Sequence, residues 1–92
     1  MHNLEIIEGK RTIHADFSAD QWGLYTNSIS RNVIEAVATR FNDHLNEYVN
    51  GGYTKAQTLE GMHDIMSTYR EFGAYDTEPR AFLDVVLEEI YK

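Results

Sequence analysis

The chain has 92 residues, 42% of them apolar and 25% charged, which allows one domain spanning residues 1–92 with a single small core. It contains no cysteine, which excludes a disulfide framework, a thiolate nucleophile and a thiolate metal site. Its net charge of −7 disfavours direct contact with nucleic acid or a membrane surface and favours basic partners.

The first expected element is a β-hairpin over about residues 3–16, because strand-favouring residues flank Gly9-Lys10, a pair suited to a type II′ turn. Moving this loop by one residue would mix apolar and polar side chains on both faces of the sheet. The loop therefore predicts one register: Leu4 opposite Ala15, Glu5 opposite His14, Ile6 opposite Ile13 and Ile7 opposite Thr12. The Leu4, Ile6 and Ile13 face should lie on the helices, and the strand edges are the expected place for a second chain to join.

A capping box, Ser18-Ala-Asp-Gln21, predicts a short helix over 19–26, and the polar run 26–28 predicts a break before a long helix over 29–50. A single continuous helix is the alternative. Asn50-Gly51-Gly52 is typical of a helix end. The long helix is expected to bury a stripe that recurs at steps of three and four residues: Ile29, Val33, Val37, Phe41, Leu45 and Tyr48.

Two further helices are predicted over 55–72 and 77–91. The second capping box, Thr54-Lys-Ala-Gln57, begins the first of them, and Pro79 is tolerated in the first turn of the second. Short connections favour antiparallel neighbours. The sequence thus predicts an α+β fold, in which an N-terminal two-stranded antiparallel hairpin precedes a mostly helical part packed as a small bundle. The apolar stripe of the 55–72 helix is Leu59, Met62, Ile65, Met66, Tyr69 and Phe72, and that of the 77–91 helix is Phe82, Leu83, Val86, Leu87 and Ile90.

No catalytic or cofactor motif is visible, so we expect no enzyme, no cofactor and no metal. The i, i+3 spacing of Glu60 and His63 resembles one half of a di-iron motif, but such sites need a second motif and further inward carboxylates. A metal-dependent enzyme using His44, His63 and Glu60 is the remote alternative. Tyrosine is frequent, with six residues, and Tyr53 and Tyr75 are expected in loops, where they either contact a partner or fold back on the core.

Most of the negative charge belongs to residues 41–92, where ten acidic residues stand against four basic ones; residues 1–40 hold five against four. We therefore expect a non-enzymatic module that binds a protein with a basic surface, possessing carboxylates that can take the places of phosphates. The expected contact residues are Asp43, Glu47, Tyr53, Glu60, Asp64, Glu71, Tyr75, Asp76, Glu78, Asp84, Glu88 and Glu89. The plainer alternative is that the negative charge only keeps the domain soluble.

In size, charge and lack of a catalytic motif, the chain resembles the small acidic inhibitors that phages and mobile elements make against host defence systems, such as anti-restriction and anti-CRISPR proteins. This resemblance in build implies an inhibitor that occupies a nucleic-acid-binding surface. The alternative is a small self-associating structural or regulatory subunit, such as a homodimer. A cytoplasmic location is expected, because no apolar run reaches ~18 residues and the N-terminus lacks the pattern of a signal peptide.

Overall fold

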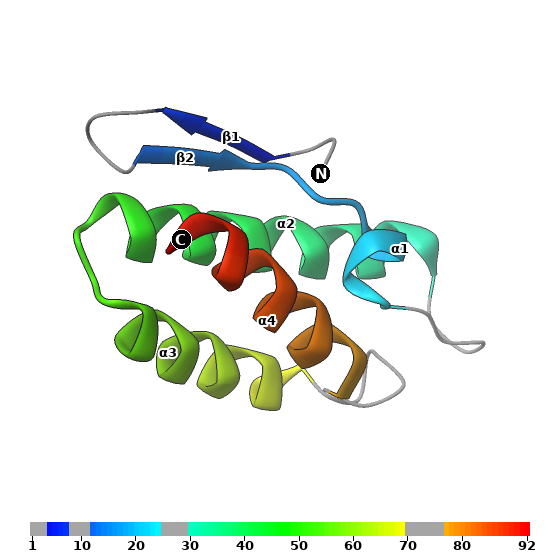
Figure 1. Cartoon of the computed structure of the whole chain (residues 1–92). Coiled ribbons are helices and arrows are strands. Elements are labelled where there is room, and N and C mark those ends of the chain that lie inside the picture. The colour runs from blue at the N-terminus through cyan, green and yellow to red at the C-terminus, as the bar shows by residue number, and fades with distance from the viewer. Residues whose placement is uncertain (1–3, 8–11, 25–29, 70–76) are drawn as a thin grey trace.

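The computed structural model describes residues 4–7, 12–24, 30–69 and 77–92. Within them, a two-stranded hairpin is followed by four helices, which confirms the predicted α+β architecture (Figure 1). The elements are β1 (Leu4–Ile7), β2 (Thr12–Ala15), α1 (Ala19–Trp22), α2 (Arg31–Asn50), α3 (Lys55–Thr68) and α4 (Thr77–Ile90).

The strands pair in the predicted antiparallel register: Leu4 with Ala15, Glu5 with His14, Ile6 with Ile13 and Ile7 with Thr12. Ile13 and Ala15 are buried and His14 is exposed, so β2 alternates between core and solvent as expected. Leu4 packs against the core from β1. The turn at Gly9-Lys10 lies outside the described residues.

The predicted helix over 19–26 is too long, because α1 ends at Trp22. Its capping box is present: Ser18 Oγ accepts from the Gln21 N–H, and Gln21 Oε1 accepts from the Ser18 N–H. Gly23 then adopts a left-handed conformation with φ of 78°, which turns the chain out of the helix. A new N-cap at Ser30 begins α2, so the single continuous helix is also wrong.

The stripe predicted for α2 is displaced at its first described position. Val33 is 40% exposed, and its neighbour Ile34 is buried instead. Steps of four residues rotate by about 40° around a helix, so a stripe read as 33-37-41-45 drifts away from the core at one end. Ile29 lies outside the described residues. The rest of the buried face is Val37, Ala38, Phe41, Asn42, Leu45 and Val49.

The end of α2 is the predicted glycine stop. The Gly52 N–H donates to the Val49 carbonyl, and the Tyr53 N–H donates to the Tyr48 carbonyl. Gly52 supplies the left-handed residue with φ of 86°. The rings of Tyr48 and Tyr53 pack edge to face at 5.3 Å, which is the apolar contact that accompanies this Schellman type of helix end.

The last two helices begin as predicted and end earlier. The Thr54–Gln57 capping box begins α3, which ends at Thr68, with Tyr69 as its C-cap. Residues 70–72 of the predicted helix, including Phe72, lie outside the described residues. The fourth helix, predicted over 77–91, ends at Ile90. The buried residues of both helices follow the predicted stripes, with Thr58 and Pro79 added.

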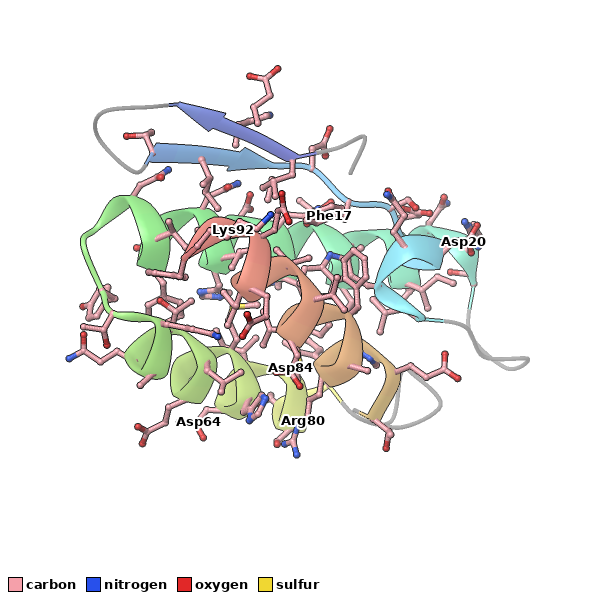
Figure 2. The ribbon with its side chains drawn as sticks, in the orientation of Figure 1. Phe17, Asp20, Asp64, Arg80, Asp84 and Lys92 are labelled. Atoms are coloured by element: carbon pink, nitrogen blue, oxygen red, sulfur yellow. The ribbon has the colours of Figure 1, made fainter. Side chains whose placement is uncertain are left out.

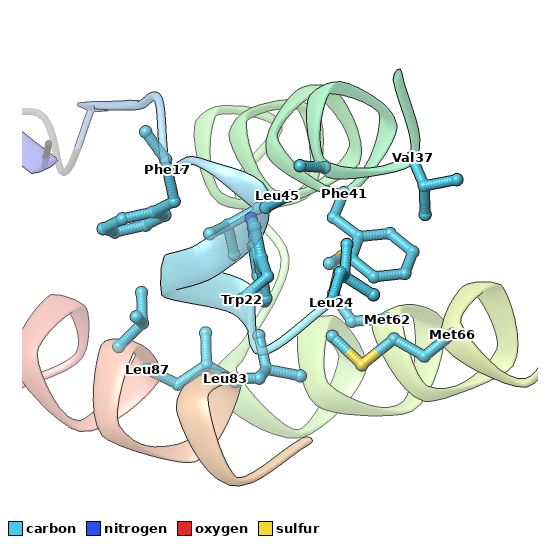
Figure 3. Close-up of a cluster of buried hydrophobic side chains, with 14 of the residues drawn as sticks. Phe17, Trp22, Leu24, Val37, Phe41, Leu45, Met62, Met66, Leu83 and Leu87 are labelled. Carbon is cyan, nitrogen blue, oxygen red and sulfur yellow. The ribbon is translucent and has the colours of Figure 1, made fainter. Parts of the chain in front are cut away.

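The core is centred on Trp22 (Figure 3). Its indole packs edge to face against Phe41 from α2 and Phe82 from α4, at centroid distances of 5.4 and 5.1 Å. Phe17 packs on Trp22 and Phe82 as well. Although α1 is a single turn, it contacts both α2 and α4 and fills the space between them.

Candidate functional site

Three asparagines on successive turns of α2 bind the backbone of β2 and of the residue Phe17 that follows it; we call Asn42, Asn46 and Asn50 the asparagine ladder. The Ala15 N–H donates to Asn46 Oδ1 at 2.7 Å, and Asn46 Nδ2 donates to the Ala15 carbonyl at 3.0 Å. Asn50 makes the same two bonds with Ile13, at 2.7 and 3.0 Å. Each amide therefore supplies one donor and one acceptor, as a neighbouring strand would.

Asn42 is the buried rung of the ladder. Its Oδ1 accepts from the Phe17 N–H at 3.1 Å, and its Nδ2 donates to the Phe17 carbonyl at 2.7 Å. The same Oδ1 accepts from Trp22 Nε1 at 2.9 Å. Asn42 thus connects the chain leaving the hairpin to the centre of the core, and it leaves its buried partners satisfied.

The ladder closes one edge of the hairpin. The N–H and C=O groups of Ile13 and Ala15 point towards α2, so those of Thr12 and His14 point the other way, towards β1. The edge of β2 that faces α2 is therefore occupied by side-chain amides. This corrects the expectation that both hairpin edges are available to a second chain.

The second edge of the hairpin is the outer edge of β1. Glu5 faces His14 and Ile7 faces Thr12 across the sheet, so the polar backbone groups of the alternate residues, Leu4 and Ile6, point away from β2. Among the described residues, no hydrogen bond from outside β2 reaches Leu4 or Ile6. Figure 1 shows β1 as the outermost element, with β2 between it and the helices.

The acidic residues predicted to bind a partner are exposed wherever they are described: Asp43 and Glu47 on α2, Glu60 and Asp64 on α3, and Glu78, Asp84, Glu88 and Glu89 on α4. They come from three helices that surround the core rather than from one face. Figure 2 shows Asp64 and Asp84 on the side where α3 and α4 meet. Glu71, Tyr75 and Asp76 lie outside the described residues.

Glu88 and Glu89 have cationic neighbours. Lys55 Nζ pairs with Glu88, and its hydrogen bond and positive charge hold the pKa of the Glu88 carboxyl below its usual range. Lys92 Nζ lies 3.4 Å from Glu89 Oε2. Among the described residues, no ion pair involves Asp43, Glu47, Glu60, Asp64 or Asp84, so these five carboxylates leave negative charge on the surface.

The tyrosines of the α2–α3 end contribute to the fold. Tyr91 Oη donates to the Tyr53 carbonyl at 2.8 Å and lies 3.0 Å from Thr58 Oγ1, which connects the end of α4 to the start of α3. The Tyr53 ring packs on Tyr48, as the fold-back interpretation expects, yet Tyr53 remains 47% exposed. It can therefore both support the helix end and face a partner.

The described residues do not bring His44, His63 and Glu60 together as a metal site. Within the described ranges, no three His, Asp or Glu side chains are placed to hold a metal ion. His44 lies against the Tyr48 ring, at a centroid distance of 6.4 Å. His63 Nε2 is buried, and no described residue bonds it.

The asparagine ladder was not predicted from the sequence, although its residues recur at four-residue steps.

Comparison with protein families, with curated proteins and with solved structures finds no match to the chain. Among the described residues, no helix combines the length and apolar character that crossing a membrane requires.

Proposed function

We propose that this chain is a non-enzymatic binding module for a protein with a basic surface, contacted through α2, α3 and α4. The proposal is supported by three exposed carboxylate pairs one helical turn apart, Asp43/Glu47, Glu60/Asp64 and Asp84/Glu88, of which only Glu88 has an ion-pair partner among the described residues. Like charges at this spacing destabilise a helix by a few tenths of a kcal/mol. A cationic partner would convert that repulsion into attraction.

One form of this function is inhibition of a nucleic-acid-binding protein. The two members of each pair lie about 6 Å apart along the helix axis, so each helix offers negative charge in a row. A basic surface that attracts phosphates would attract such rows by the same electrostatics. This form is the anti-restriction or anti-CRISPR type of phage protein. The lack of cysteine fits a reducing compartment, and the cytoplasm is the location that we propose.

The test compares single aspartate substitutions that change the net charge equally. Asp43→Asn, Asp64→Asn and Asp84→Asn each alter one helix, and Asp16→Asn is the control, an exposed aspartate outside the helices and without an ion pair among the described residues. The partner is first isolated on the immobilised chain from an extract of the source cells and eluted with salt. Its affinity is then measured by calorimetry between 50 and 500 mM salt, a range over which the Debye length falls from about 14 Å to about 4 Å.

We expect each helix variant that touches the partner to weaken binding by about 1.4- to 5-fold, the equivalent of one surface ion pair of about 0.2–1 kcal/mol. Asp16→Asn should leave the affinity unchanged. Competition by duplex DNA would support the inhibitor form. An affinity that does not change with salt would show that the charge serves solubility and not recognition. An equal loss in all four variants would show that only the net charge matters and that the carboxylates of α2, α3 and α4 make no specific contact.

A second candidate function, a self-associating structural or regulatory subunit, is favoured by the outer edge of β1, which no other described element covers. Two chains paired at that edge would form one continuous sheet. Sedimentation at several concentrations tests this candidate, and a chain that stays monomeric at high micromolar concentration excludes it.

A further inference from the structure

The hairpin can accept a strand on one side only. The asparagine ladder occupies the edge of β2, whereas the N–H and C=O groups of Leu4 and Ile6 on β1 point outwards without a partner among the described residues. These alternating donors and acceptors are the groups that bind an extended peptide by strand addition. The edge therefore selects an extended backbone as its occupant.

The charge on β1 decides which extended backbone fits. Glu5 is exposed, faces His14 across the sheet, and forms no ion pair within the described residues. In an added strand, the residue opposite Glu5 is its closest cross-strand neighbour, and opposite charges there are favourable whereas like charges are not. A lysine or arginine at that position would complement Glu5.

A second copy of this chain fits less well. To use all four outward groups of both chains, two β1 strands would pair Leu4 of one copy with Ile6 of the other. That antiparallel register sets Glu5 directly opposite Glu5 of the second copy, which is unfavourable. Two chains that each carry a net charge of −7 also repel one another.

We propose that the outer edge of β1 binds an extended basic segment of a protein partner as a third strand, with a lysine or arginine opposite Glu5. The inference rests on the proposed function, because it names one way in which the basic partner is held. The acidic helices attract the partner over a distance, and the β1 edge fixes one of its segments by backbone hydrogen bonds.

The test follows backbone amide exchange in the full chain by NMR, with the peptide acetyl-Thr-Val-Lys-Val-Lys-Val-Thr-amide as the probe. We expect the peptide to slow exchange of the Leu4 and Ile6 amides at least tenfold. The Glu5 and Ile7 amides already face β2 and should change less. The same peptide with glutamate in place of lysine is the matched control, and it should leave all four amides unchanged.

Two variants separate the backbone from the charge. Ile6→Pro removes an outward N–H and no hydrogen bond between β1 and β2, so proline is tolerated there as on other edge strands. It should weaken peptide binding at least fivefold while the Ala15 amide stays protected by Asn46. Glu5→Gln should weaken binding two- to fivefold and keep the edge intact. The exchange measurement on the unaltered chain remains decisive even if Ile6→Pro disturbs the hairpin.

Three results would overturn the proposal. If the lysine peptide binds but changes only amides of the helices, strand addition is wrong while the proposed acidic binding function stands. If the lysine peptide does not bind, the β1 edge is not a site for basic strands. If Leu4 and Ile6 are already protected without peptide, and the chain sediments as a dimer, the occupant is a second copy.

Discussion

Removal of the rungs of the asparagine ladder one at a time should destabilise the protein in the order Asn42, Asn46, Asn50. The order follows from hydrogen bonds and burial. Asn42 is buried and takes part in three hydrogen bonds, including that of Trp22 Nε1, whereas Asn46 is half-buried and takes part in two. Asn50 also takes part in two, but it is exposed, so water can replace its amide.

The magnitudes follow from the cost of hydrogen bonds. At about 1 kcal/mol for each bond, with a further penalty for buried groups left unpaired, Asn42→Ala should cost about 3–5 kcal/mol. Asn46→Ala should cost about 2 kcal/mol, and Asn50→Ala about 1 kcal/mol or less. For a domain of this size, whose free energy of unfolding is about 5–14 kcal/mol, the first loss is a large fraction of the total.

Urea denaturation followed by tryptophan fluorescence measures these differences, and amide exchange assigns them to the hairpin. Each variant should speed exchange at its own partner residue: Phe17 for Asn42, Ala15 for Asn46 and Ile13 for Asn50. Equal losses at all three positions, or a loss below 1 kcal/mol at Asn42, would refute the conclusion that the ladder holds β2 on α2.

Three smaller perturbations test local geometry. Gly23→Ala should destabilise the protein by about 2 kcal/mol or more in urea, because φ is 78° and the new Cβ would lie 2.9 Å from Glu78 Cβ. Gly52→Ala, with φ of 86° and open space around it, should cost only the conformational strain of about 1 kcal/mol. Arg31 lowers the pKa of Asp20 through its hydrogen bond and charge, so the stability from this pair is present above the ordinary aspartate pKa of about 3.9 and is lost as pH falls through the lowered value. Arg31→Gln should raise the Asp20 pKa towards 3.9 in an NMR titration and remove that part of the acid dependence.

Local sequence patterns were sufficient to predict the strand register and the helix starts, because a few neighbouring residues determine the backbone conformation there. The register of β1 and β2 followed from the separation of apolar and polar faces, and the starts of α1 and α3 followed from capping boxes. The early end of α1 was harder to foresee. Gly23 could have continued the helix at a modest cost, and only its packing next to Glu78 and the bonds of Leu24 and Gly23 to α1 carbonyls favour the left-handed turn.

One part of the candidate site, the exposed carboxylates, was also predicted from the sequence, and the other part, the asparagine ladder, was not. Exposure of the carboxylates follows from their places between the apolar positions of each helix, so the sequence predicted it. The ladder involves residues 25 to 37 positions apart in sequence, and no local pattern pairs them. Asparagine is a weak helix former, so three at four-residue steps on one helix was the available signal. Three asparagines at this spacing can bind a strand only when one with alternating free backbone groups lies beside the helix, and the sequence of the helix does not show this.

The geometry of the ladder explains why it has three rungs and why its burial is graded. Four helical residues rise about 6.0 Å, whereas two strand residues rise about 6.7 Å, so the mismatch after two steps is still small enough for hydrogen bonds. Each step also rotates the asparagine by about 40° around α2. The side chains accordingly pass from buried at Asn42 to half-buried at Asn46 and exposed at Asn50. A fourth rung before Asn42 would fall at Ala38, which already points into the core. A helix can therefore replace a strand neighbour only over a short strand, and the two strands of this hairpin are each four residues long. Two rungs bind the four-residue strand β2 and the third binds Phe17 just after it, and the outer edge of β1 is the one left without a partner among the described residues.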